Sequence, residues 1–312
     1  MADAARDPFD AWCKMSGSVA PPGQPSRLSQ PQQRHEDANV SALLSSYAGE
    51  TAANLKESLE SIYTQTVPPD QLVLVLDGPV DVGQEEVVAQ YACDSRIANL
   101  TLVRLPSNVG LARAMNAGLE RCSATYIMRA DSDDICDPRR LELQLDYFKA
   151  HPETDVVAGW SAEFYKDGRP ERWKVSSVHH DAVVRALRWR NVLVHPTVLI
   201  RTETLRRVGG YRPHFAMLED YDLYVRLVLS GARFHVIPKV LLRMRASDEQ
   251  YRRRGGLRYC LNEIRFRLSC LRLGFLNTTE FFVTTFLYVV FRLIGGSFRE
   301  RLYALVRSST GE

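Results

Sequence analysis

Long hydrophobic runs and paired cysteines are both missing from this 312-residue chain. No stretch approaches the roughly 18 uninterrupted apolar residues of a membrane-spanning helix, so a polytopic membrane protein is excluded. The six cysteines form no C-x-x-C pair, and no histidine lies near them at zinc-ligand spacing. We therefore expect reduced thiols in a cytosolic protein. The charges of Asp3, Arg6, Asp7 and Asp10 also interrupt any apolar core of a secretory signal peptide.

The glycine-rich phosphate-binding motifs G-x-G-x-x-G and G-K-[ST] are absent too. The apolar fraction of 45% and the charged fraction of 25% are ordinary for a globular protein, which excludes disorder throughout. The net charge of +3 is unevenly distributed. Residues 239–312 hold 14 Lys and Arg against 6 Asp and Glu, a local +8, whereas the rest hold 26 against 31, or −5. We expect two surfaces with different partners, and no nucleic acid among them, because the main body is acidic and no recognition module occurs.

The patterning divides the chain into three parts. Residues 16–38 contain four Pro, four Gln and four Ser without periodicity, so we predict that residues 1–38 are a disordered tail. Apolar runs at 40–44, 71–77, 100–105 and 125–130 alternate with helical patterns at 55–63, 84–91 and 111–119. This alternation predicts an α/β fold with a Rossmann-like, mainly parallel sheet flanked by helices.

The second half of the chain is less regular. Helical patterns occupy 139–148 and 219–229, and the last 60 residues are helical and basic in character. The predicted strands lie at 155–160, 192–201, 232–237 and 240–244, with a hairpin turn at 166–169 (KDGR).

An acidic segment, Asp131-Ser132-Asp133-Asp134, directly follows the fourth predicted strand. Ligands of open α/β sheets bind beyond the carboxyl ends of strands. Carboxylates two positions apart in extended backbone point the same way, so they can share a hard divalent cation such as Mg²⁺ or Mn²⁺. A D-x-D triplet alone is common, and 220–222 contains a second one. Three acids at a strand end repel one another without a cation, so we predict a metal site here.

A second acidic group, Glu219-Asp220-Tyr221-Asp222, begins an amphipathic helical pattern. Acidic residues favour the first turn because the helix dipole stabilises them, which is a purely structural explanation. The same dipole keeps a carboxylate ionised, as a general base requires. The residues alone leave both explanations open.

Two further segments have less specific patterns. In the turn Asn108-Val109-Gly110, the glycine permits close backbone approach and Asn108 can cap the next helix, which is the explanation we favour. Residues 281–291 (FFVTTFLYVVF) form an apolar run flanked by arginines. As a helix the run covers about 16 Å, short of a bilayer core of roughly 30 Å. A basic amphipathic element in the membrane interface and a core helix both remain open.

Taken in this order, the segments resemble family 2 glycosyltransferases of the GT-A fold, from about Val40 to the end of the chain. The matching segments are NVSALLSSY, LESIYTQTVPPDQLVLVLDG, NVGLARAMNAGL, RADSDDICDPRRLELQLDYF, HPTVLIRTETLRRVGGY and LEDYDLYVRLVLSG. The tail segment YRRRGGLRYCLNEIRF is similar to the branch that builds bacterial capsular and exopolysaccharides, the amylovoran-type transferases. The resemblance implies a GT-A domain over 39–246, with a nucleotide-sugar half at about 39–135 and an acceptor half at about 136–246. Residues 247–312 would be a basic amphipathic helical extension that contacts a membrane surface.

The resemblance also implies roles for individual residues. Asp133 would bind the metal, and Asp220 would be the catalytic base with Glu219 beside it. The residues implied in nucleotide-sugar binding are Ser45, Ser46, Tyr47, Asp77, Asn108, Gly110, Asp131, Ser132 and Arg245. The sequence departs from the family where Pro-Thr-Tyr-Asn is replaced by SSYA, where the paired Asp before Gly reads Leu76-Asp77, and where Ala-Arg-Asn reads AMN at 114–116. The donor base is therefore open among uracil, thymine and guanine.

The function that the resemblance implies is inverting, metal-dependent sugar transfer in cell-surface polysaccharide biosynthesis. The donor would be a nucleotide-sugar, and the acceptor a saccharide or a polyprenyl-diphosphate-linked glycan. We expect a cytoplasmic protein that is peripheral on the inner face of the cell membrane. One alternative is a sugar nucleotidyltransferase, which would need a basic triphosphate loop, and 45–50 contains no Lys or Arg. The other is a catalytically degenerate, membrane-docked partner subunit, against which the retained Asp131, Asp133 and Asp220 argue.

Overall fold

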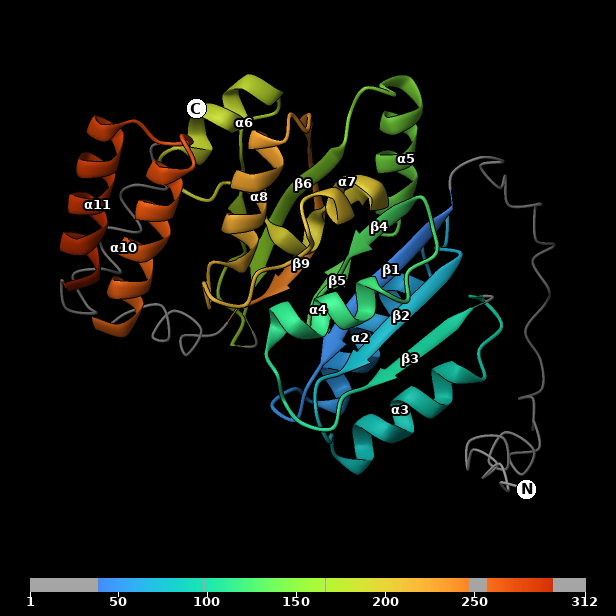
Figure 1. The fold of residues 1–312 in the computed structure, drawn as a ribbon. Helices are drawn as coiled ribbons and strands as arrows, with labels where there is room; N and C mark the ends of the chain where they lie inside the picture. Colours follow the sequence, from blue (N-terminus) through green and yellow to red (C-terminus); the bar gives the residue numbers. More distant parts are fainter. Residues whose placement is uncertain (1–38, 98, 166, 247–256, 294–312) are drawn as a thin grey trace, which may run out of the picture.

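A single nine-stranded sheet with helices on both faces organises the part of the chain that the computed structural model describes, residues 39–97, 99–165, 167–246 and 257–293 (Figure 1). The strands are β1 (Val40–Ser46), β2 (Gln71–Leu76), β3 (Leu100–Arg104), β4 (Tyr126–Arg129), β5 (Ile135–Cys136), β6 (Val156–Phe164), β7 (Arg172–Lys174), β8 (Leu199–Arg201) and β9 (Phe234–Arg245). The helices are α2 (Ala52–Tyr63), α3 (Val82–Ala92), α4 (Leu111–Leu119), α5 (Arg140–Ala150), α6 (His180–Leu187), α7 (Thr202–Arg207), α8 (Glu219–Leu229), α10 (Leu257–Arg272) and α11 (Thr278–Leu293). The predicted tail at 1–38 lies outside the described residues.

The strand order is β3-β2-β1-β4-β8-β6-β9-β5, with β7 paired to β6. Strands β3, β2, β1 and β4 are parallel, as predicted from their alternation with helices. Strand β8 runs antiparallel to both β4 and β6, and β5 runs antiparallel to β9. The first half is therefore a Rossmann-like parallel sheet, and the second half extends it as a mixed sheet.

Two apolar layers enclose the sheet, because alternate residues of each strand face opposite sides. In β1, Leu43 packs in the cluster that contains α4 and α8, whereas Ala42 and Leu44 pack in the cluster that contains α2, α3 and α5. All three side chains are fully buried. The central strands are apolar on both faces for this reason. The loops that follow these strands lie outside the two apolar layers.

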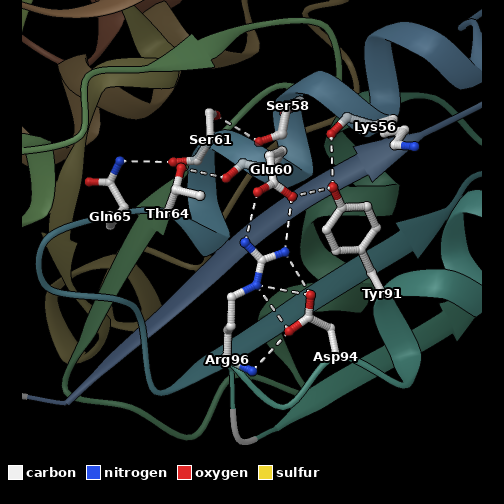
Figure 2. Close-up of polar contacts among 9 residues, drawn as sticks. All are labelled: Lys56, Ser58, Glu60, Ser61, Thr64, Gln65, Tyr91, Asp94 and Arg96. Carbon is white, nitrogen blue, oxygen red and sulfur yellow. Dashed lines mark hydrogen bonds and ion pairs between the residues drawn. The ribbon is translucent and has the colours of Figure 1, made fainter. Parts of the chain in front are cut away.

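A polar network ties α2 to the end of α3 (Figure 2). The Arg96 guanidinium donates to the carboxylates of Glu60 and Asp94, with N–O distances of 2.7 Å to each. The Tyr91 hydroxyl donates to the same Glu60 carboxylate at 2.7 Å. Hydrogen bonds from Arg96 and Tyr91 lower the pKa of Glu60, which therefore stays ionised. The network fixes the outer helices of the parallel half beneath the loops that follow β1 and β2.

The structure differs from the predicted strands in two places, each at a proline. In the segment predicted as a strand at 192–201, only Leu199–Arg201 is extended, because Pro196 lies in a 3-10 turn and has no N–H for a sheet ladder. The strands predicted at 232–237 and 240–244 are one strand, β9. Its register against β6 jumps from Ile237 to Val240, so Pro238 and its neighbour form a bulge. The predicted hairpin is confirmed, since β6 pairs antiparallel with β7.

The cysteines differ from the expectation at one position. Cys122, Cys136, Cys260 and Cys270 are buried free thiols, and burial raises the pKa of Cys122 and of Cys270 to about 12. Cys93, exposed just after α3, is disulfide-bonded. The expectation of reduced thiols throughout is therefore wrong at Cys93, where no packing protects the sulfur.

Helices α10 and α11 form a hairpin at one end of the molecule (Figure 1). Phe266 of α10 packs against Tyr221 of α8 at 4.7 Å between ring centroids, which anchors the hairpin on the sheet domain. Between the two helices, Arg267 is fully buried, pairs with Glu263 at 3.0 Å and lies 4.1 Å from the Tyr288 ring centroid. Of the helices within the described residues, none is long and apolar enough to cross a membrane.

Candidate active site

The residues predicted to bind a nucleotide-sugar gather at one edge of the parallel sheet. Strands β1, β2 and β4 are parallel, so their carboxyl ends meet there. Ser45 and Ser46 end β1, Asp77 follows β2, and Asp131 follows β4 by two residues. The structure thus brings together segments that lie more than 80 positions apart in the sequence.

The loop after β1 is held by a glutamine that sequence reasoning missed. Gln84 of α3 is fully buried, and its carboxamide accepts from the Ser46 hydroxyl at 2.9 Å. The amide nitrogen of Gln84 donates to the carbonyl oxygens of Glu50 at 2.8 Å and of Tyr47 at 3.2 Å. The Tyr47 ring remains 41% exposed at the end of this loop, as a stacking surface for a base requires.

Asp77 connects the β2 loop to the Asn-x-Gly turn. Its two carboxylate oxygens accept from the backbone N–H of Val109 at 2.7 Å and of Gly110 at 3.0 Å. Gly110 has a φ of +86° and is itself the N-cap of α4, without a side-chain cap bond. The expectation that Asn108 caps this helix is therefore wrong, because the left-handed glycine occupies the cap position and Asn108 is exposed beside the site.

Three carboxylates after β4 converge, with ligand oxygens of Asp131, Asp133 and Asp134 all within 4.8 Å of one another. Burial, followed by the charges of Asp131 and Glu50, raises the pKa of Asp133 to about 7. Burial and the two neighbouring carboxylates also hold the pKa of Asp134 well above its usual range. One Asp134 oxygen is buried without a hydrogen-bond partner in the described structure.

This donor set suits a hard divalent cation. All of its donors are oxygen atoms, which is the chemistry of Mg²⁺ and Mn²⁺ sites. The raised pKa of Asp133 reports burial first and charge repulsion second, and a cation would offset both, while the unpartnered Asp134 oxygen is an acceptor without a donor. The predicted ligand Asp133 thus lies in a cluster that fits a metal, with Asp134 as a further acidic member and Ser132 buried between the acids.

Two arginines contact this acidic segment. Arg129, buried at the end of β4, forms an ion pair with Asp131. Arg245 ends β9, where its backbone N–H donates to Asp134 at 3.1 Å and its Nε donates to the Asp133 carbonyl at 3.2 Å. Its Nη2 donates to the Glu57 carboxylate of α2 at 2.5 Å. The structure therefore places Arg245 at the acid cluster, while Arg129 is a residue that the sequence reasoning missed.

The second acidic group begins α8. The Asn191 side-chain amide donates to one Asp220 carboxylate oxygen at 2.7 Å, and the Tyr221 backbone N–H donates to the other at 2.8 Å. Burial raises the pKa of the neighbouring Glu219, with the Asp220 charge adding to this effect. Asp222 is buried and pairs with Arg226 at 2.7 Å. The second D-x-D triplet therefore contains one structural acid and one acid held at the site.

The backbone before this helix is strained. Met217 has a φ of +69°, which lies in the left-handed region. Among the described residues other than glycine, Met217 alone has a positive φ. Its side chain is 46% exposed, so packing does not explain the conformation. Such strain is common beside functional groups, and here it turns the chain immediately before Glu219.

One cavity joins the two acidic groups. It has a volume of about 770 Å³, and its lining includes Arg129, Asp131, His195, Tyr211, Glu219 and Asp220. The exposed Trp173 of β7 also contributes to its wall. A cavity of this size accommodates a sugar together with part of a nucleotide diphosphate. Asp131 and Asp220 therefore line the same cavity.

His195 is another wall residue that the sequence reasoning did not single out. Its exposed fraction is 8%, and its Nδ1 lies 2.8 Å from the Tyr224 hydroxyl. Its Nε2 has no partner within the described structure, and neither has the Nε of the nearby Arg129. Burial and the Arg129 charge hold the pKa of His195 well below its usual range, so the imidazole is neutral. The available signal was His195-Pro196 itself, which begins the segment HPTVLIRTETLRRVGGY and lies inside the strand predicted at 192–201.

An acid cluster lies at the carboxyl end of a central parallel strand, and one of its members shares a cavity with a second carboxylate, an arrangement that fits a GT-A glycosyltransferase. The chain belongs to glycosyl transferase family 2, whose family model matches residues 41–215. It is an enzyme of the glycosyltransferase class, which excludes the sugar nucleotidyltransferase considered from the sequence.

Two relatives match this chain over most of its length and most of their own. The chain is 35% identical over 246 residues to the amylovoran biosynthesis glycosyltransferase AmsE of Erwinia amylovora, covering 78% of this chain and 91% of the relative. It is 30% identical over 266 residues to the UDP-Gal:alpha-D-GlcNAc-diphosphoundecaprenol beta-1,3-galactosyltransferase of Escherichia coli, covering 85% and 95%.

Solved structures share the fold at lower identity. S. aureus TarS 1-349 in complex with UDP-GlcNAc matches with a TM-score of 0.61 at 17% identity, over 81% of this chain and 72% of that chain. The mannosyltransferase PcManGT from Pyrobaculum calidifontis in complex with GDP-Man and Mn²⁺ matches with a TM-score of 0.57 at 18% identity, over 85% and 70%. These similarities confirm the predicted GT-A fold.

Proposed function

We propose that this enzyme transfers a sugar from a nucleotide-sugar to a saccharide or polyprenyl-diphosphate-linked glycan in cell-surface polysaccharide biosynthesis. The observation that carries the proposal is the cavity shared by Asp131, a member of the acid cluster, and Asp220. The names of the two relatives support this class of acceptor and pathway, because one makes amylovoran and the other acts on a diphosphoundecaprenol-linked sugar.

The donor would lie along the edge formed by the β1, β2 and β4 loops. Tyr47 offers an exposed ring to the base, and Asp77 shapes the Asn108–Gly110 turn beside it. Because Asp77 already binds two backbone amides, we assign it mainly to holding this turn. Residues 39–135 thus serve as the nucleotide-sugar half, and residues 136–246 supply the acceptor side. The departures from the family motifs leave the choice of base to experiment.

We assign Asp133 as a ligand of Mg²⁺ or Mn²⁺, with Asp131 and Asp134 completing the acidic cluster. A bound divalent cation would neutralise the charge that develops on the leaving diphosphate. Within the protein, Arg129 balances part of the negative charge of the cluster through Asp131. Arg245 also contacts the cluster, donating hydrogen bonds to the Asp133 carbonyl and to the Asp134 carboxylate. The proposed function is therefore metal-dependent.

Asp220 would accept the proton of the attacking acceptor hydroxyl. Asn191 and the Tyr221 amide donate to both of its oxygens, which fixes the orientation of the carboxylate. One in-line displacement at the anomeric carbon follows, with the nucleotide diphosphate leaving from the opposite face. Such a single displacement inverts the anomeric configuration. Glu219, protonated more readily because of burial, would hydrogen-bond the acceptor.

We assign recognition of the transferred sugar to the neutral His195. A saccharide hydroxyl can accept from an arginine N–H while it donates to an imidazole nitrogen. Arg129 and His195 both line the cavity, but their Nε and Nε2 atoms are themselves buried from solvent and have no protein partner in the described structure. We infer that a bound sugar displaces this wall enough for one of its hydroxyls to reach them.

A screen of nucleotide-sugars by thermal unfolding tests the donor and metal assignments. A donor at 100 times its Kd should stabilise the folded chain by about 2.7 kcal/mol. We expect one base to give this shift with Mn²⁺, and little shift after chelation of the metal. Asp133→Asn should lose the response, whereas Asp146→Asn, on the exposed side of α5, should keep it. Equal shifts for all nucleotide-sugars with and without Mn²⁺ would contradict the proposal.

The proposed acceptor places the enzyme at a lipid surface. A polyprenyl-linked glycan cannot leave the bilayer, so the enzyme must meet it there. We therefore propose that the chain is cytoplasmic and peripheral on the inner face of the cell membrane, in accord with the basic composition of residues 239–312.

A further inference from the structure

Helix α11 has its apolar face toward solvent. Five of its side chains form one exposed stripe at the helical spacing i, i+1, i+4, i+5 and i+8. They are Phe282 (65% exposed), Val283 (42%), Phe286 (68%), Leu287 (53%) and Val290 (39%). We call these five residues the α11 stripe. A helix of a soluble globular protein normally presents the opposite arrangement, with its apolar face buried.

The other face of α11 packs inward through polar and aromatic groups. Glu280 pairs with Arg188, which follows α6, at 3.0 Å. One turn later, Thr284 is buried and its hydroxyl donates to the Glu280 carbonyl at 2.7 Å. A further turn on, the Tyr288 ring packs under Arg267 of α10. These contacts fix the helix in rotation, so the α11 stripe cannot turn inward without breaking them.

We propose that the α11 stripe lies in the interfacial region of an anionic membrane, an inference that rests on the proposed lipid-linked acceptor. The 16-residue helix is about 24 Å long, so it would lie along the surface and not cross the bilayer. Its position at the outer end of the molecule leaves the stripe accessible, away from the parallel sheet (Figure 1).

Charge around the stripe suits anionic lipid. A surface groove of about 500 Å³ at the beginning of α11 is lined by Arg185, Arg188, Trp189 and Glu280, among others. Within the groove, Glu280 is paired with Arg188 and Asp181 offsets Arg185, so the excess of basic charge is that of the sequence of residues 239–312 as a whole. Trp189 is 47% exposed in this groove, and tryptophan is favoured at membrane–water interfaces. Apolar insertion and attraction to anionic lipid would then act together.

A second copy of the chain is a poorer occupant for this face. Five partly exposed side chains of this size offer on the order of 500 Å² of apolar surface, within the range of the largest patch on ordinary monomers. A stable dimer usually buries about 800 Å² on each partner with close shape complementarity. A lipid interface needs neither that area nor a matching shape.

Vesicle flotation of the full chain tests the inference. Wild type should float with phosphatidylglycerol-containing vesicles, float several-fold less at 0.5 M NaCl, and float little with neutral vesicles. Phe282→Asp/Phe286→Asp should reduce the bound fraction at least tenfold, and the milder Phe282→Ser/Phe286→Ser should reduce it several-fold. Val82→Asp, at an exposed valine (74%) on α3, adds one negative charge away from the stripe and should bind like wild type. Unfolding midpoints equal to wild type confirm that each variant is folded.

Two results would overturn the inference. One is flotation that is unchanged by the stripe variants. The other is a lipid-free dimer, measured by light scattering, that the same variants convert to a monomer, because a second copy would then cover the stripe. Sugar transfer to a soluble acceptor analogue distinguishes a failure of the membrane inference from a failure of the proposed function. Stripe variants should retain that transfer, and its absence in wild type would instead refute the proposed function.

Discussion

Replacing Asp133 by asparagine should stabilise the metal-free enzyme while abolishing its response to metal. In the folded chain, burial and the charges of Asp131 and Glu50 raise the pKa of Asp133 from 3.8 to about 7. Each tenfold change in proton affinity corresponds to about 1.4 kcal/mol, so the ionised carboxylate costs the folded state up to roughly 4 kcal/mol. Water reaches the partly accessible side chain, and we therefore expect about 2 kcal/mol.

The sign and the pH window follow from the raised pKa. The folded chain retains a proton that the unfolded chain loses near pH 4, so the associated stability is fully present below pH 4 and is lost as pH rises to about 7. Asparagine carries no charge and escapes this loss. The variant should therefore gain about 2 kcal/mol at pH 8 and under about 1 kcal/mol at pH 5.

Thermal unfolding after chelation measures this difference. For a chain of this size, 2 kcal/mol corresponds to roughly 4 °C in Tm, so Asp133→Asn should unfold about 4 °C above wild type at pH 8. Added Mn²⁺ should raise the Tm of wild type and leave that of the variant unchanged. Asp146→Asn should match wild type in every condition. A variant that is less stable than wild type at pH 8, or that responds to Mn²⁺ as wild type does, would refute the charge-repulsion argument.

Three further substitutions test the other parts of the site. Asp220→Asn should lower kcat by roughly 10²- to 10⁴-fold with donor Kd nearly unchanged by calorimetry; joint loss of both would make Asp220 a donor ligand instead. His195→Phe should weaken nucleotide-sugar binding about tenfold and leave binding of the free nucleotide unchanged, and equal weakening of both would indicate a structural role. Asp77→Ala should lower the free energy of unfolding by about 2 kcal/mol, since two hydrogen bonds to the Asn108–Gly110 turn are lost. An unchanged midpoint in denaturant unfolding would show that the turn does not depend on Asp77.

The parallel half of the fold was predictable because its signals are local. Strands β1 and β2 are continuous apolar runs that are buried on both faces, and helical patterns of ordinary length separate them. The second half of the fold was less predictable from the sequence, because its strands pair with distant segments. Pro196 ends the extended backbone inside one predicted strand, whereas Pro238 only introduces a bulge into a strand that was predicted as two.

The acidic residues of the site were predictable, and their partners were not. Asp133 and Asp220 lie at element ends, where the strand and helix patterns mark them. Arg129 and Gln84 sit inside elements and look like ordinary strand and helix residues, so only the fold shows that they contact Asp131 and Ser46. The exposed α11 stripe was likewise invisible, since sequence shows that an apolar run exists but not which way it faces.

The configuration of the transferred sugar tests the central claim most directly. Wild-type enzyme, Mn²⁺, the nucleotide-sugar identified by thermal unfolding and a lipid-diphosphate-linked saccharide analogue would be followed by proton NMR of the new anomeric signal. A single displacement assisted by Asp220 predicts a product of inverted configuration, formed only with the metal and lost in Asp220→Asn. A product with retained configuration, or transfer that continues without metal or without Asp220, would contradict the account.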